Sequence, residues 1–106
     1  MSRAIIVSRH PASVRWLMMN LVDVDAIQHH LDLAQLRSGD CVYGNLTAHL
    51  VAQLNDLGVR YFHLQIQIPE HLRGVELDDS ELMALNPCLT EIRATVSGLD
   101  PPHLVQ

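Results

Sequence analysis

The sequence predicts a small, single-domain α/β fold, a Rossmann-like sandwich with a mainly parallel sheet. Short apolar runs typical of buried strands alternate with helical apolar patterns in the order β-α-β-β-α-β-α-β. The 106 residues have room for one core of this kind. We therefore expect residues 1–97 to form one domain and residues 98–106, which contain two adjacent prolines, to form a loose C-terminal tail.

The first third of the chain predicts a strand, a helix and a second strand. Residues 4–7 form a short apolar run rich in β-branched side chains, which is typical of a buried strand. Pro11 suits the first turn of the helix that follows. The apolar stripe of this helix has the spacing of one helix face and consists of Val14, Leu17, Met18 and Leu21. Residues 26–31 predict the second strand, although their alternation is poor.

The middle of the chain predicts a strand, a helix and another strand. Gly39-Asp40 makes a turn, residues 41–43 begin a strand, and Asn45 suits the N-cap of a helix. Gly58 supplies the left-handed stop of that helix, whose apolar face is formed by Leu46, Leu50, Leu54 and Leu57. The next strand ends at Pro69, and its apolar side consists of Phe62, Leu64, Ile66 and Ile68. Either water or a second subunit covers its polar side, which carries His63, Gln65 and Gln67.

The last third predicts one short helix and one strand. Residues 78–81 resemble a capping box at the start of a helix that ends near Pro87. The last strand follows from the alternation of Ile92, Ala94 and Val96.

Charge and composition narrow the possible functions. The seven basic residues are all arginines and are outnumbered by twelve acidic residues, for a formal net charge of -5. No long nucleic-acid partner is expected, because such binding usually needs a basic excess, whereas a small anion needs only a few arginines and backbone N–H groups. The absence of lysine excludes Schiff-base chemistry. The longest apolar runs are four residues, so we expect no membrane span or secretion signal and a soluble, cytoplasmic protein.

The cysteines and histidines predict neither a disulfide nor a metal centre. Cys41 and Cys88 lack a CxxC spacing, which suits a reducing cytoplasm, and we expect both to be small apolar core residues. The seven histidines include the adjacent pair His29-His30 but no HxxxH or HExxH pattern. Adjacent side chains point apart, so this pair does not suit a shared metal ion, and we expect no metal. We expect no cofactor either.

Three polar segments are predicted to meet at one edge of the sheet. They are residues 8–10, residues 43–45 and residues 69–74, and each follows a predicted strand. In parallel sheets, ligands bind outside the carboxyl ends of the strands, near the point where the strand order reverses. Two of the segments lead into helix N-termini, which favour anions. This edge is therefore the predicted ligand site.

Ser8-Arg9-His10 is the densest cluster of reactive side chains. Arg9 can bind two phosphate oxygens, His10 can transfer a proton near neutral pH, and Ser8 can hydrogen-bond a phosphate oxygen. The alternative is a polar loop that only caps the helix. Asn45 either orients a ligand hydroxyl or phosphate, or only caps the next helix. His49, one helical turn further on, faces either the same cleft or water.

Several stretches of the chain together resemble one protein family. They span residues 4–74 and comprise Ile5-Ile6-Val7-Ser8-Arg9-His10-Pro11, Trp16-Leu17, Gly39-Asp40, Gly44-Asn45-Leu46, Arg60-Tyr61-Phe62-His63-Leu64 and Arg73-Gly74. In order and spacing they resemble a small CRISPR-associated family of type III systems that is classed among the ring nucleases.

This resemblance implies a CARF-like nucleotide-binding domain that acts as a homodimer. It implies an enzyme that linearises cyclic oligoadenylate and so switches off type III signalling. We expect the ring to be cyclic tetra-adenylate, whose two-fold symmetry matches a dimer. We expect no metal, because a ribose 2′-hydroxyl can attack its own 3′-phosphate. The alternative is a sponge that binds the messenger without cutting it. Ser8, Arg9, His10, Asn45 and Arg73 fall on the polar positions of the family's motifs. The expected catalytic residues are Ser8, Arg9, His10 and Asn45. The expected ligand-binding residues are Tyr43, Gly44, Leu46, His49 and Arg73.

Overall fold

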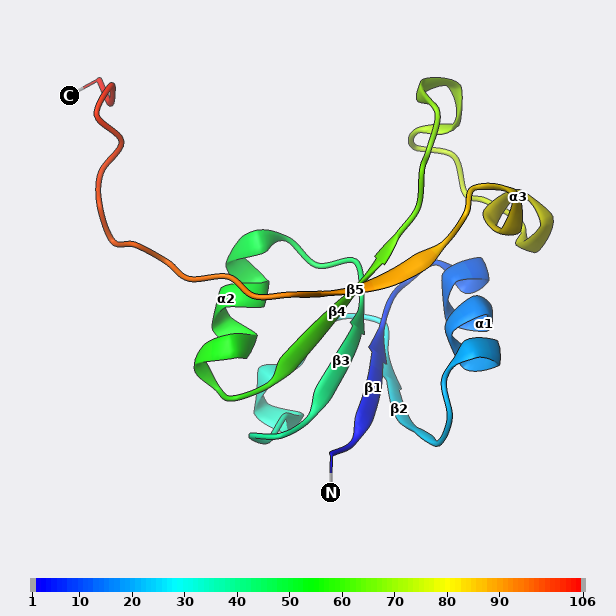
Figure 1. Ribbon diagram of the computed structural model, residues 1–106, viewed down its shortest axis with the longest axis horizontal. Coiled ribbons are helices and arrows are strands. Elements are labelled where there is room, and N and C mark those ends of the chain that lie inside the picture. Colours follow the sequence, from blue (N-terminus) through cyan, green and yellow to red (C-terminus); the bar gives the residue numbers. More distant parts are fainter. Residues whose placement is uncertain (1, 106) are drawn as a thin grey trace.

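The computed structural model describes residues 2–105, which form one sheet flanked by three helices (Figure 1). The elements are β1 (Ala4–Val7), α1 (Pro11–Asn20), β2 (Val24–Gln28), β3 (Cys41–Gly44), α2 (Ala48–Asp56), β4 (Arg60–Gln65), α3 (Asp79–Ala84) and β5 (Cys88–Ile92). Short 3₁₀ turns occupy Leu33–Gln35 and Glu70–Leu72. The predicted order of strands and helices is therefore confirmed.

The sheet has the strand order β2-β1-β3-β4-β5. The pairs β1–β2, β1–β3 and β3–β4 are parallel, and β5 is antiparallel to β4. Helices α1 and α3 cover one face of the sheet and α2 covers the other (Figure 1). The fold class is confirmed as a small, mainly parallel α/β sandwich. Because the chain leaves β1 toward one neighbour and later returns to its other side, the strand order reverses between β1 and β3.

The core has two parts, one on each face of the sheet. Successive residues of β1 alternate between them, as the pleat of a strand requires. On the α2 side, the buried residues are Ile5, Val7, Val42, Val51, Leu54, Val59 and Tyr61. On the α1 side, they are Ile6, Leu17 and Leu64.

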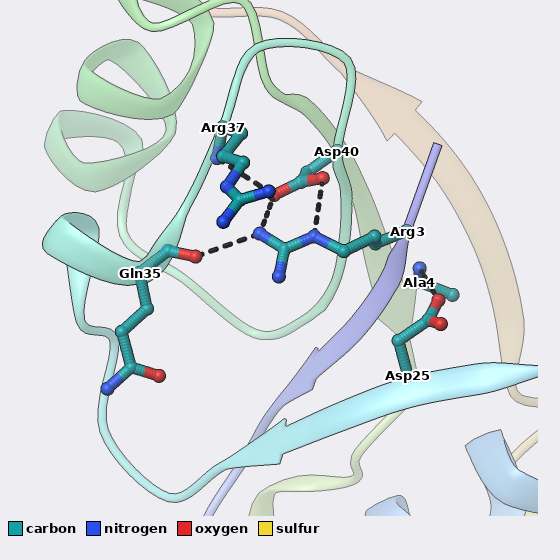
Figure 2. Close-up of polar contacts among 6 residues, drawn as sticks. All are labelled: Arg3, Ala4, Asp25, Gln35, Arg37 and Asp40. Carbon is teal, nitrogen blue, oxygen red and sulfur yellow. Dashed lines mark hydrogen bonds and ion pairs between the residues drawn. The ribbon is translucent and has the colours of Figure 1, made fainter. Parts of the chain in front are cut away.

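An ion pair holds the amino-terminal edge of the sheet together (Figure 2). The Arg3 guanidinium donates to both carboxylate oxygens of Asp40, at 3.0 and 2.6 Å. Asp40 is only 3% exposed and also accepts the backbone N–H of Arg37 at 2.8 Å. The hydrogen bond from Arg3 lowers the pKa of the Asp40 carboxyl, although burial opposes this. This pair fixes the edge opposite to the carboxyl ends of the parallel strands.

Two predicted features near the N-terminus need correction. Strand β2 is Val24–Gln28 rather than residues 26–31. It lies at the edge of the sheet and is mostly exposed, so its sequence carries little apolar alternation. In α1, Met18 is 47% exposed, because the helix buries its first turn and Leu17 instead.

Helix α2 begins later than predicted. Its N-cap is Thr47, not Asn45, whose side chain is bonded elsewhere. The buried residues of α2 are Val51, Ala52 and Leu54, whereas Leu57 is exposed. The left-handed stop is confirmed, with φ of +79° at Gly58.

The last two strands differ from the prediction in their bounds. Strand β4 is Arg60–Gln65 rather than residues 62–68, and both Tyr61 and Leu64 are buried, although they lie on opposite faces. Helices on both faces cover this strand, so one apolar side does not mark its limits. The capping box at Asp78 is confirmed, whereas the last strand is Cys88–Ile92 and does not reach residue 96.

The two cysteines differ in their surroundings. Cys41 is buried as expected, but Cys88 is exposed because it begins the edge strand β5. After β5 the chain continues along the α2 side and extends away from the sheet (Figure 1). Residues 98–105 are exposed and contain no helix or strand. No helix within residues 2–105 has the length and apolar character needed to cross a membrane.

Candidate functional site

A polar cavity lies where the carboxyl ends of β1, β2 and β3 meet. Its volume is about 300 Å³. The polar residues around it are Ser8, Arg9, His10, His29, His30 and Asn45. The apolar ones are Val7, Leu31, Leu46 and Leu50. The four predicted catalytic residues and Leu46 are therefore brought together at one cavity, beside the reversal of strand order.

Ser8 shapes the turn that carries the cluster from β1 into α1. It is 7% exposed, and its Oγ accepts the backbone N–H of His10 at 3.1 Å. Its own N–H donates to the Gln28 carbonyl at 3.0 Å, which extends the pairing of β1 with β2. Pro11 then starts the helix. Ser8 thus fixes the backbone from which His10 projects.

The His10 ring faces a carboxylate from a distant part of the chain. Its Nδ1 lies 3.0 Å from Oε2 and 3.3 Å from Oε1 of Glu76, in the loop before α3. A carboxylate at Nδ1 favours the tautomer with the proton on that nitrogen. The other ring nitrogen, Nε2, is then the one available to a ligand.

Asn45 ties β3 to its neighbour strand. Its Nδ2 donates one of its two N–H groups to the Leu64 carbonyl at 2.6 Å. The Oδ1 atom remains an acceptor at the cavity, suited to a hydroxyl group of a ligand.

The Tyr61 hydroxyl forms hydrogen bonds with the backbone at the end of β3 and in the segment that follows. Its hydroxyl donates to the Gly44 carbonyl at 2.9 Å and accepts the Leu46 N–H at 2.7 Å. The ring nitrogen Nδ1 of His63 lies 2.7 Å from the same oxygen. Burial raises the pKa of Tyr61, and the hydrogen bond from the Leu46 backbone partly offsets this. The Leu46 N–H is therefore occupied and is not a ligand donor.

Gly44 is required by the close approach of two strands. A Cβ at this position would overlap the backbone carbonyl oxygen of Val7 in β1. Glycine lets β1 and β3 pair at the point where the strand order reverses, directly beside the cavity.

The arginines divide into paired and unpaired groups. Arg3, Arg15 and Arg60 form ion pairs with Asp40, Asp79 and Glu91 at 2.6, 2.7 and 2.8 Å. The exposed arginines that belong to no ion pair within residues 2–105 are Arg9, Arg37, Arg73 and Arg93, and of these Arg9 lines the cavity. The guanidinium of Arg9 is thus free to bind an anion at the cavity.

Four predicted ligand-binding residues do not line this cavity, namely Gly44, described above, and Tyr43, His49 and Arg73. Tyr43 stacks on Phe62 with ring centroids 4.9 Å apart, on the α1 side, and burial raises its pKa. His49 is exposed on the first turn of α2. Arg73 is exposed after the second 3₁₀ turn, and its neighbour Gly74 lines a second cavity.

The second cavity adjoins the first and is larger, at about 420 Å³. His10 and Asn45 line both cavities. Most of its other lining is apolar and comes from α1, from the segment after β4 and from α3.

Several residues at the cavities did not follow from the sequence. His29 and His30 were expected within a strand, but β2 ends at Gln28 and leaves them beside residues 8–10. Their position directly after a strand could have identified them as site residues. The weak alternation of that strand led to wrong predicted bounds, so they were placed inside it. Glu76 carried no signal, because only the folded chain brings it to His10. Residues 2–105 contain no group of three or more His, Cys, Asp or Glu side chains placed to hold a metal ion.

The fold and this edge place the protein among the small Rossmann-like α/β domains, in which ligands bind at the carboxyl ends of parallel strands. Residues 5–95 match the family model described as "Putative CRISPR-associated protein (Cas_VVA1548)". The chain belongs to this family, which supports the CRISPR association expected from the sequence. No curated protein and no solved structure matches the chain.

Proposed function

We propose that the protein is a metal-independent ring nuclease that binds cyclic oligoadenylate, above all cyclic tetra-adenylate, and linearises it. Its family membership supports a role in CRISPR immunity. The observation that carries the proposal is the cavity at the β1–β3 reversal, where Arg9, His10 and Asn45 meet. This combination offers an anion-binding group, a proton-transfer group and a hydroxyl acceptor at one place.

The reaction needs no outside nucleophile. The ribose O2′ attacks the adjacent phosphorus, the bond from phosphorus to O5′ breaks, and the product ends in a 2′,3′-cyclic phosphate and a 5′-hydroxyl. The O2′ proton passes to a base, and O5′ gains a proton. The protein has to align O2′, phosphorus and O5′ and to stabilise the charge that develops on the phosphate oxygens.

Arg9 and His10 take the central roles in this proposal. The unpaired Arg9 guanidinium binds two phosphate oxygens and stabilises the transition state. His10 accepts the O2′ proton at Nε2, since Nδ1 faces Glu76. Ser8 acts by fixing the His10 backbone, because its hydroxyl oxygen already accepts that N–H.

Asn45 and Arg73 position the ring. The Oδ1 of Asn45 accepts a ribose hydroxyl, since its Nδ2 is held by Leu64. Arg73, exposed beside the second cavity, holds a more distant phosphate of the ring.

A homodimer suits this substrate. Drug-sized ligands fill cavities of ~300–1,000 Å³. A ring of four nucleotides is larger than such a ligand, whereas the polar cavity measures only about 300 Å³. One protomer's polar cavity is therefore too small to hold the whole ring. A two-fold axis matches the symmetry of such a ring and supplies a second copy of each unpaired arginine. Those arginines offset the repulsion between a polyanion and a chain of net charge -5.

The test is to incubate the protein with a large molar excess of cyclic tetra-adenylate in EDTA and to separate the products by chromatography. We expect many equivalents of ring per protomer to become linear oligoadenylates with a 2′,3′-cyclic phosphate. A ring that stays intact while raising the melting temperature of the protein would leave only the sponge. A ring that neither reacts nor raises the melting temperature would refute both functions.

A further inference from the structure

We infer that the larger cavity is a base subsite, which takes an amino-bearing nucleobase while the attached ribose and phosphate occupy the polar cavity. The inference rests on the proposed function, because it assigns the substrate's base to a place beside the reacting phosphate. Its chemical basis, however, is the lining of the larger cavity alone.

The walls of this cavity are apolar. The residues Ile66, Ile68, Leu72, Val75, Leu77 and Leu82 line it. Ile68 and Val75 remain 38% and 52% exposed, although they face a concave site. A flat heteroaromatic ring removes such surface from water and packs against it.

The charge at this cavity disfavours phosphate. No arginine lines it, and Glu76 contributes a carboxylate. A carboxylate repels an anion but accepts a hydrogen bond from an exocyclic amine. One of its oxygens can still do so while Glu76 faces His10, because a carboxylate accepts about four hydrogen bonds. This favours adenine over hypoxanthine, which carries a carbonyl at the same ring position.

Ser13 lines the same cavity and supplies a hydroxyl group. A hydroxyl can donate a hydrogen bond to a ring nitrogen of a ligand.

The two cavities share lining residues in the order that a nucleotide requires. His10 and Asn45 line both. A nucleotide with its base among the apolar residues therefore carries its ribose past Asn45 and its phosphate toward Arg9. The proposed scissile bond then lies next to His10.

The experiment uses Val75→Trp, which fills the cavity from an exposed position, and Val96→Trp as the control. Val96 is also exposed, and it lines neither of these cavities. Circular dichroism checks that both variants fold. Ligand-detected NMR then measures the binding of adenosine 5′-monophosphate, inosine 5′-monophosphate and ribose 5-phosphate to all three proteins.

We expect wild type and Val96→Trp to bind the adenine nucleotide several-fold more tightly than the inosine one. Val75→Trp should weaken adenine-nucleotide binding by about tenfold or more, the scale of one lost base contact, with little effect on ribose 5-phosphate. Equal affinities for the two nucleotides, or unchanged binding to a folded Val75→Trp, would overturn the base subsite.

Ring cleavage and nucleotide binding test the nuclease activity and the base subsite separately. If wild type cleaves cyclic tetra-adenylate and Val75→Trp cleaves it with unchanged kcat and KM, the base subsite is wrong and the nuclease proposal stands. If wild type leaves the ring intact but the nucleotide affinities follow the expected order, the subsite stands without the nuclease.

Discussion

Individual side chains at the cavity are distinguished by whether the protein already uses them. Arg9 lines the cavity and belongs to no ion pair within residues 2–105, whereas Arg3, Arg15 and Arg60, which lie elsewhere, are held by carboxylates. Asn45 donates one N–H to the Leu64 carbonyl and keeps its oxygen, and His10 has one nitrogen facing Glu76. What remains free is a set of groups suited to a phosphate, a hydroxyl and a proton.

Arg9→Ala should slow ring cleavage by ~10²–10³-fold, the typical cost of losing one group that stabilises a transition-state oxyanion. Arg37→Ala is the matched control, because Arg37 lies at the opposite edge of the sheet (Figure 2). Single-turnover rates and melting temperatures of both variants check this. Equal rates for the two variants would remove Arg9 from the chemistry.

Glu76 should act by positioning His10. We expect His10→Ala to lower the single-turnover rate by ~10²–10⁴-fold, and Glu76→Ala to lower it by a smaller factor. The carboxylate orients the ring but does not itself transfer the proton. Glu76→Gln, which keeps the shape, should recover part of the loss and change the dependence of the rate on pH. A rate for Glu76→Ala equal to wild type would show that the contact has no part in the reaction.

The sequence reveals some of these residues and hides others, for a physical reason. Residues 8–10 follow a short, buried, β-branched strand, so their place at the sheet edge is predictable. His29 and His30 follow an exposed edge strand with little pattern, and Glu76 reaches His10 only through folding. Contacts of this second kind depend on loop conformation, which a single sequence does not specify.

At the scale of the secondary-structure elements, the neighbouring strands determine the path of the loop after β3. Tyr61 of β4 spans the Gly44 carbonyl and the Leu46 N–H, so the path of this loop depends on the neighbouring strand. Gly44 in turn lets β3 approach β1. The polar edge is therefore set by strand pairing as well as by its own residues.

Tyr61→Phe should lower the free energy of unfolding by about 1–3 kcal/mol, because it leaves a carbonyl and an N–H without their partner. Tyr43→Phe is the control. The Tyr43 ring is stacked on Phe62, its hydroxyl makes no hydrogen bond within residues 2–105, and its removal should cost less than about 0.5 kcal/mol. Urea denaturation measures both. The two variants losing equal stability would contradict the role given to the Tyr61 hydroxyl.

The element order was predictable because apolar runs and helix signals alternate clearly. The first and last residues of each element were harder to predict. Helices cover both faces of the interior strand β4, so the alternation of apolar residues does not mark where the strand ends. The prediction therefore extended the strand to Ile66 and Ile68. These residues instead leave the sheet and line the larger cavity. Asn45 has good capping chemistry, but Leu64 offered it a tertiary partner and Thr47 became the cap.

At the scale of the whole molecule, the two edges of the sheet differ in what they carry. The Arg3–Asp40 pair closes the amino-terminal edge (Figure 2). The two cavities lie at the carboxyl edge. Stability and activity should therefore be affected by different variants.

Asp40→Asn should lower stability at neutral pH by about 1–3 kcal/mol, and this difference should shrink in acid. The folded protein lowers the pKa of Asp40, so its contribution is complete above the unfolded pKa of ~3.9 and is lost as pH falls through the folded pKa. Urea denaturation over this pH range provides the test, and Arg3→Gln should remove the same pH dependence. A difference that stays constant into acid would contradict this account.

The central claim, that the carboxyl edge binds the cyclic messenger, is tested most directly by NMR. Proton–nitrogen correlation spectra of the His10→Ala variant, in which we expect cleavage to be slow, are recorded with and without cyclic tetra-adenylate. We expect the largest amide shifts in residues 8–10, 29–30 and 44–46 and around Glu76, with little change near Arg3 and Asp40. Shifts concentrated at the amino-terminal edge, or none at saturating ligand, would contradict the account.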